Sequence, residues 1–166
     1  MAGPGRNISG KIFTSPSFGL GGDCIQVWGS DGGTLIQDCI FDLAGVPLAD
    51  QDEAIDCIKG AHVVIERCVF IGCKKAILGG NGDYPAEDKS GLLFLKNCAF
   101  IRCGRRCPEV QDGVHADMRN CWVHDWGVGS PWRHAHCEGF AVLQDERTYP
   151  LALGGRPCQP YRRSGH

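Results

Sequence analysis

A solenoid of stacked short strands, an all-β parallel β-helix, is the fold that this sequence predicts. A cysteine-centred segment recurs about every 30 residues. Each copy is rich in the β-branched and aromatic residues that form strands, and turns bearing glycine and aspartate separate the copies. No stretch shows a sustained 3.6-residue apolar period, which argues against a helical framework.

The repeat is visible in four seven-residue segments that carry a cysteine at the fifth position. They are Leu35–Phe41, Val64–Phe70, Phe94–Phe100 and Asp117–Val123. Their cysteines lie 29, 30 and 23 residues apart, and a second pair, Cys73 and Cys103, is again 30 residues apart. The residue before each of the four cysteines is polar, and a large apolar residue follows two positions after it. A period in this range is that of one solenoid coil.

Equal positions of successive coils stack at about 4.8 Å, the spacing of hydrogen-bonded strands. We therefore expect a column of cysteines inside the coil, with a parallel column of phenylalanine rings. The predicted members are Cys39, Cys68 and Cys98, and Phe41, Phe70 and Phe100. Each coil covers its apolar face only against its neighbours, so the ends need caps.

We expect a single β-helix domain over residues 1–166, with regular coils over about 20–127. Residues 1–20 are rich in glycine and would make a poor cap. Residues 128–166 contain four prolines and are expected to form an irregular tail over the other end.

Eleven cysteines leave two interpretations. An odd number cannot be fully paired within one chain. Because no Cys-x-x-Cys spacing is present, the cysteine pattern gives little support to a zinc site. The chain is either a secreted disulfide scaffold or a repeat core in which free thiols act as small apolar side chains. The regular spacing favours the second interpretation and predicts free, poorly reactive thiols.

The formal net charge of −2 is too small to indicate a nucleic-acid or membrane partner. No apolar run approaches the ~20 residues of a membrane-spanning helix, and the opening Met1–Arg6 shows no apolar signal-peptide segment. We expect a monomer without nucleic-acid or membrane partners.

Five segments follow the order of motifs in one enzyme family. Asp23–Ser30 is similar to the strand before the calcium region of pectate lyases, and Asp52–Ala61 resembles their DGxxDIxxGA motif. Lys74–Leu78 resembles DKAML, Arg106–Gln111 resembles RxPxxR, and Gly113–Trp122 resembles GxxHxxNN. The family is polysaccharide lyase family 1, whose fold is the right-handed parallel β-helix; relative to it the chain looks truncated, without the early coils.

This resemblance implies a secreted pectate lyase, although no signal peptide is visible. Such enzymes cleave polygalacturonate, the acidic polysaccharide of pectin, by β-elimination with Ca²⁺ as cofactor. A base takes the C5 proton, which is α to the uronate carboxylate, and the C4 oxygen leaves. Calcium on that carboxylate withdraws charge and stabilises the enolate-like intermediate.

The implied calcium ligands are Asp52 and Asp56, which offer the hard oxygens that calcium prefers. Residues four apart in a strand face the same side, so both carboxylates can point outward. The calcium-binding aspartate of the family falls on Gln37, which leaves its neighbour Asp38 as the third candidate ligand if the strand bulges. The alternative is that the acidic residues of 50–56 form only a solvated turn.

The resemblance implies catalytic roles for Lys75, which would pair with the substrate carboxylate, and Arg106, which would abstract the proton. A guanidinium has a pKa above about 12, so binding carboxylate or stabilising the enolate is the alternative role of Arg106. Gln111, in place of the second arginine of the motif, and His115, as a groove-wall residue, are the further substrate-binding candidates. A surface charge is the alternative role of Lys75.

Three functional classes follow. The first is a calcium-assisted lyase, and the second is a non-catalytic β-helix fragment or carbohydrate-binding scaffold, which Gln37, Gln111 and the short length favour. The third, a β-helix hydrolase, needs two carboxylates at a defined separation, and the sequence lacks the NxD…DD…GHG series of such enzymes.

Overall fold

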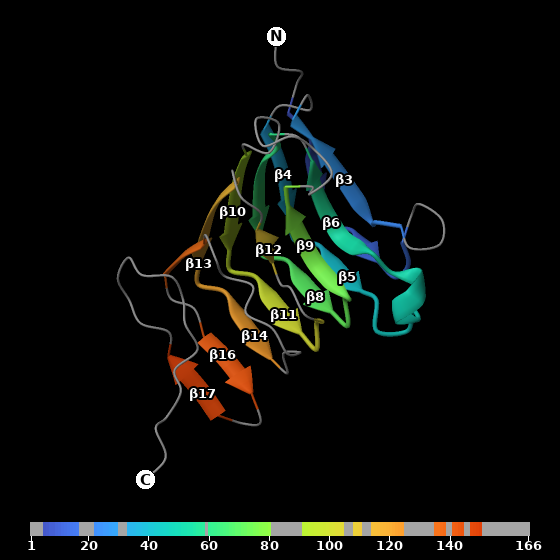
Figure 1. The fold of residues 1–166 in the computed structure, drawn as a ribbon, viewed down its shortest axis with the longest axis vertical. Helices are drawn as coiled ribbons and strands as arrows, with labels where there is room; N and C mark the ends of the chain where they lie inside the picture. The colour runs from blue at the N-terminus through green and yellow to red at the C-terminus, as the bar shows by residue number, and fades with distance from the viewer. Residues whose placement is uncertain are drawn as a thin grey trace.

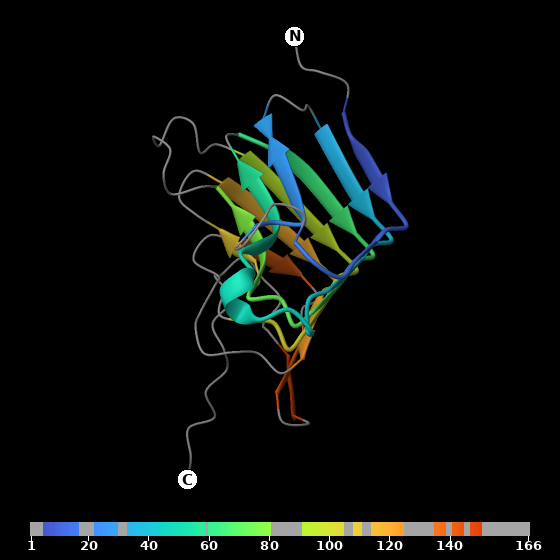
Figure 2. The same ribbon diagram turned by 90° about the vertical axis from the view of Figure 1, so that its right-hand side faces the viewer.

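The computed structural model describes residues 5–16, 22–29, 33–58, 60–80, 91–104, 108–110 and 114–124, and the backbone of 135–138, 141–144 and 147–150. Three sheets of mostly parallel strands enclose one core, and the coils stack from the N-terminal end to the C-terminal end (Figures 1 and 2). This arrangement confirms the predicted parallel β-helix. Within the described residues, no helix has the length and apolar character needed to cross a membrane.

Each full coil contributes one strand to each sheet. Sheet A holds β1 (Asn7–Ser9), β4 (Gly33–Gln37), β7 (His62–Glu66), β10 (Gly91–Lys96), β13 (Val114–Arg119) and β15 (Ala135–Glu138). Sheet B holds β2 (Ile12–Phe13), β5 (Ile40–Asp42), β8 (Val69–Ile71), β11 (Ala99–Ile101), β14 (Trp122–His124), β16 (Ala141–Gln144) and β17 (Arg147–Pro150). Sheet C holds β3 (Ile25–Trp28), β6 (Glu53–Ile58), β9 (Lys75–Gly79) and β12 (Glu109–Val110). A 3-10 turn, η2 (Leu48–Asp50), precedes β6.

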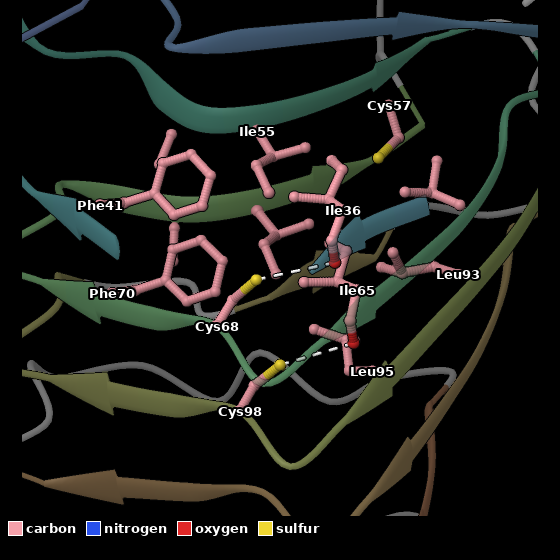
Figure 3. Packing of buried hydrophobic residues seen from close by; sticks show 14 of the residues in the cluster. Ile36, Phe41, Ile55, Cys57, Ile65, Cys68, Phe70, Leu93, Leu95 and Cys98 are labelled. Carbon is pink, nitrogen blue, oxygen red and sulfur yellow. Dashed lines mark hydrogen bonds between the residues drawn. The ribbon is translucent and has the colours of Figure 1, made fainter. Parts of the chain in front are cut away.

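The predicted phenylalanine column fills the core behind sheet B (Figure 3). Phe41 and Phe70 stack with ring centroids 4.8 Å apart, and Phe70 and Phe100 with centroids 5.0 Å apart. Phe13, which the repeat did not include, stacks on Phe41 at 4.8 Å. The in-register pairing of Phe41, Phe70 and Phe100 on neighbouring parallel strands brings equal rings face to face.

The predicted cysteine column is also present, and all of its described members are buried, free thiols. Cys68 donates to the carbonyl of Ile36 at 3.6 Å, and Cys98 donates to the carbonyl of Ile65 at 3.5 Å (Figure 3). Each thiol thus bonds the backbone of the preceding coil, while its body packs as a small apolar group. Burial raises the pKa of Cys68 to about 12, which supports the prediction of low reactivity.

The polar residue before each column cysteine makes the bend from sheet A to sheet B. Asp38, Arg67, Asn97 and Asn120 all have φ between 49° and 55°. Asparagine and aspartate enter this left-handed region more readily than most residues. The side chains also form a ladder, in which Asn120 donates to Asn97 at 2.7 Å. The sequence showed only that these positions are polar, and the backbone supplies the reason for three of the four.

The regular coils extend beyond the predicted limits of about 20–127. The strands β1 and β2 begin the stack in the segment expected to be a poor cap, and β15 and β16 pair in parallel with β13 and β14. The predicted irregular tail, 128–166, therefore contains strands, including the β16–β17 hairpin. Strands of two to four residues are too short to show a period, and the neighbouring coil supplies their backbone partners.

A buried glutamine fastens the insertion between β5 and β6 to the coil. The Gln51 side chain is 1% exposed and donates to the carbonyls of Leu43 at 3.0 Å and Val46 at 2.8 Å. Its Oε1 accepts from the backbone N–H of Lys74 at 2.8 Å. Glutamine therefore satisfies backbone groups of two coils where no strand can form.

We expect Gln51→Ala to lower the free energy of unfolding by about 2–4 kcal/mol, because it leaves several buried backbone groups without partners. Urea denaturation measures the change. The matched control is Gln37→Ala, whose half-buried amide bonds only the exposed Arg67 side chain among the described residues, and which should cost about 0.5 kcal/mol or less. Equal midpoints for the two variants would contradict the role of Gln51.

Candidate functional site

Acidic and basic side chains meet where three neighbouring strands of sheet C begin. Glu53 opens β6 and Lys75 opens β9, and these two residues are Cα partners. Asp23 lies two residues before β3, and its Oδ1 accepts from the backbone N–H of Glu53 at 3.0 Å. The parallel register therefore places Asp23, Glu53 and Lys75 on three successive coils.

Asp52 completes this group, and we call Asp23, Asp52 and Glu53 the acidic cluster. One carboxylate oxygen from each lies within 4.8 Å of those of the other two. Lys75 Nζ donates to Asp52 Oδ1 at 3.2 Å and also bonds Glu53 Oε1. Gln26 Nε2 donates to Asp23 Oδ2 at 2.8 Å. Two of the three carboxylates thus share one ammonium.

Burial and their mutual contact shift the pKa values of Glu53 and Lys75. Burial raises the pKa of Glu53 to about 7, and the hydrogen bond and charge of Lys75 only partly oppose this rise. Burial of Lys75 acts to lower its own pKa, but the bonds and charges of Glu53 and Asp52 outweigh it, so the pKa of the ammonium is raised. Near neutral pH, Lys75 is charged while Glu53 can gain or lose a proton.

Asp56 lies on the outer face of β6, because its neighbours Ile55 and Cys57 point into the core (Figure 3). Asp56 is nevertheless only 4% exposed, and its Oδ1 has no hydrogen-bond partner among the described residues. Burial, and then the charges of Asp23 and Asp52, raise the pKa of Asp56 to about 7. A buried carboxylate oxygen without a partner is costly, and a cation is one group that could satisfy it.

Of the predicted ligands, the structure brings Asp52 into the acidic cluster. It places Asp56 near enough to the cluster that the charges of Asp23 and Asp52 contribute to the rise of its pKa. Asp38 lies instead in the bend between sheets A and B, where Arg67 Nε donates to it at 2.7 Å. The strand does not bulge toward the cluster there, because β4 pairs in regular register with β7 through Gln37.

The predicted substrate-binding residues Lys75 and His115 lie in different parts of the structure. Lys75 is in the cluster, whereas His115 is exposed on the outer face of sheet A, paired with Leu92. Arg106 and Gln111 lie outside the described residues. Arg106 comes three positions before Glu109 in the sequence.

The sequence analysis gave no individual role to Asp23 or to Glu53. The signal was present in the coil length, because Asp23 and Glu53 are 30 residues apart, as Cys68 and Cys98 are. Lys75 follows Glu53 by only 22 residues, so its pairing could not be found from a 30-residue period.

The donor set suits a hard cation. Calcium takes six to eight oxygens, and carboxylates are its usual protein ligands. The acidic cluster offers three carboxylates close together, with the unpartnered oxygen of Asp56 nearby. The ammonium of Lys75 now bonds two of them and must release at least one for a cation to bind.

Comparison with known proteins assigns no family: no protein-family model, no curated protein and no solved structure matches the chain. The class that the fold and site define is therefore a parallel β-helix protein with a carboxylate–lysine cluster on the outside of one sheet.

Proposed function

We propose that this protein is a calcium-dependent lyase that cleaves a polygalacturonate-like acidic polysaccharide by β-elimination. The observation that carries the proposal is the convergence of the acidic cluster and Lys75 on successive coils of sheet C. A carboxylate-bearing polymer needs positive charge for binding, and a calcium ion needs carboxylates. This site offers both within hydrogen-bonding reach. The motif resemblance supplies the substrate class and an extracellular location.

In this proposal Asp23, Asp52 and Glu53 hold the calcium ion, which when bound withdraws charge from the uronate carboxylate and makes its C5 proton more acidic. Lys75 gives up its bond to Asp52 and binds the uronate carboxylate of the substrate instead, because an ammonium binds anions as a compact point charge. The C5–H bond breaks and its electron pair forms the C4=C5 double bond, while the C4–O bond breaks and the leaving sugar oxygen takes a proton from solvent water.

Arg106 is proposed to receive the C5 proton or to stabilise the enolate. The motif resemblance of Arg106–Gln111 supplies this role. A planar guanidinium can bind a carboxylate with two parallel hydrogen bonds, which a lysine cannot do.

The test is the ultraviolet absorbance of the unsaturated uronate product on polygalacturonate, with calcium and with a chelator. We expect activity only with calcium, and we expect Lys75→Ala and Arg106→Lys each to abolish it while the fold persists. The matched control is Lys96→Ala, an exposed lysine on sheet A that should keep full activity. An active Arg106→Lys variant would move the role to Arg105, and activity unaffected by the chelator would refute the calcium role.

A second candidate is a scaffold that binds the polysaccharide without cleaving it. The observation that favours it is that Lys75 is already engaged by Asp52 and Glu53, so the cluster is largely self-neutralised. Polymer binding in an affinity gel, with no unsaturated product at any alkaline pH in the presence of calcium, would establish the scaffold in place of the enzyme.

A further inference from the structure

The outer face of sheet B carries two rows of side chains that are mostly apolar. The phenylalanine column of this sheet points into the core, so the residues on either side of each ring point outward. The register of neighbouring strands aligns these outward residues along the coil stack. The first row is Ile12, Ile40, Val69, Ala99 and Trp122, and the second row is Asp42, Ile71, Ile101 and His124.

Much of this apolar surface is open to solvent. Ile12 is 69% exposed, Ile40 is 37% exposed and Trp122 is 40% exposed. Half-buried apolar side chains fill the middle of the face: Val69, Ile71 and Ile101. A contiguous apolar patch on the surface of a protein indicates an interaction site rather than a solvated face.

The polar members of the second row lie far apart on the face. Asp42 is on β5 and His124 is on β14, with β8 and β11 between them. Three strand spacings of about 4.8 Å separate the two residues by about 14 Å, so they cannot contact each other within one chain. The polar bend residues border the face at the strand starts: Asp38, Arg67, Asn97 and Asn120. An apolar centre with polar edges is the anatomy of a protein–protein interface.

A second copy of this chain matches the face through one two-fold axis. Two copies packed face to face are related by an axis that lies between the two sheets. An axis parallel to the strands, midway between β8 and β11, keeps the strands of both sheets aligned, as is usual for packed sheets. It places β5 opposite β14 of the partner subunit. Asp42 then faces His124 of the partner subunit, and Trp122 faces Ile40 of the partner subunit.

Other positions of the axis leave Asp42 against apolar side chains. An axis centred on β8 sets Asp42 opposite Ile101 of the partner subunit, and an axis along the coil stack sets it opposite Ile40 of the partner subunit. A carboxylate buried without a partner is costly, whereas the imidazole N–H of His124 can donate to it. The axis between β8 and β11 is therefore the one that satisfies the polar groups of the face.

We propose that two copies of this chain form a dimer through the outer faces of sheet B, with Asp42 of each copy bonded to His124 of the partner subunit. Burial of the apolar rows drives association, and the two polar contacts fix the register. The sequence analysis expected a monomer, because the apolar face exists only once the outward residues of five strands are aligned. The acidic cluster lies on sheet C, so this inference does not depend on the proposed function.

Sedimentation velocity of the full chain, in reducing and calcium-free buffer, tests the dimer. We expect twice the mass of one chain, with dissociation on dilution. Trp122→Asp should raise the dimer dissociation constant by about 30-fold or more, as expected for an aromatic side chain at the centre of an interface. The matched control is Phe94→Asp, because Phe94 is 38% exposed on the outer face of sheet A and should leave the dimer intact. Circular dichroism of each variant shows whether the fold persists.

An exchange of charges tests the axis even if Trp122→Asp unfolds. Asp42→Arg and His124→Asp should each weaken the dimer about 5-fold or more, because each sets unfavourable groups opposite one another. The variant with both substitutions should dimerise within about 3-fold of the parent. Only contact between two copies can give this recovery, since the two positions are about 14 Å apart in one chain.

Three results would overturn the proposal. The first is a parent that stays monomeric up to about 100 μM, which would assign the face to a different partner. The second is an equal effect of Trp122→Asp and Phe94→Asp on the dimer. The third is a double charge variant that dimerises no better than the two single variants.

Discussion

Phe70→Ala should lower the free energy of unfolding by about 3–5 kcal/mol, the cost of truncating a buried aromatic side chain. Phe70 is 0% exposed and is stacked on both faces, against Phe41 at 4.8 Å and Phe100 at 5.0 Å. The coils above and below are held by the same column, so they cannot collapse into the cavity without breaking the strand register. The loss is a large fraction of the 5–15 kcal/mol typical of a domain.

The midpoint of urea unfolding, with the slope checked for two-state behaviour, measures this loss. The same substitution at Phe94 is the control, because that ring is 38% exposed on the outer face of sheet A. Phe94→Ala should cost about 1 kcal/mol or less. If both variants lose the same stability, the phenylalanine column is not the main support of the core.

Asp56→Asn should make the protein more stable at pH 8, by as much as about 4 kcal/mol in calcium-free buffer. The pKa of Asp56 is raised from 3.8 to about 7 by burial and by the neighbouring carboxylates. The folded state therefore holds this proton more tightly than the unfolded state does. The resulting stability is fully present below about pH 4 and is lost as the pH rises through about 7.

Thermal unfolding from pH 4 to pH 8 measures this effect. The parent should lose stability across the range, whereas Asp56→Asn should show a shallower loss, the remainder of which comes from Glu53. Asp38→Asn is the control of opposite sign: Arg67 holds the pKa of exposed Asp38 low, so the change should destabilise slightly at neutral pH. Parallel pH curves for the parent and Asp56→Asn would show that Asp56 is not buried as a charge.

The core was predictable from the sequence because every coil makes the same physical demand. An inward position must be apolar, and stacking makes it repeat at the coil length. The spacing of Cys39, Cys68 and Cys98 therefore predicted both columns. The ends were predicted less well, since β1, β2 and β16 are too short to carry a period of their own and depend on the coil beside them.

The candidate site depended more on the tertiary structure. The motif resemblance indicated Asp52 and Lys75, and these meet. Only the register showed that Asp23 and Glu53 join them, because coils of 30 and 22 residues bring three strand starts together. Only burial showed that Asp56 is a desolvated carboxyl group. Inward side chains obey one period, whereas charged side chains at the corners depend on insertions such as 43–52, whose length the local sequence pattern does not constrain.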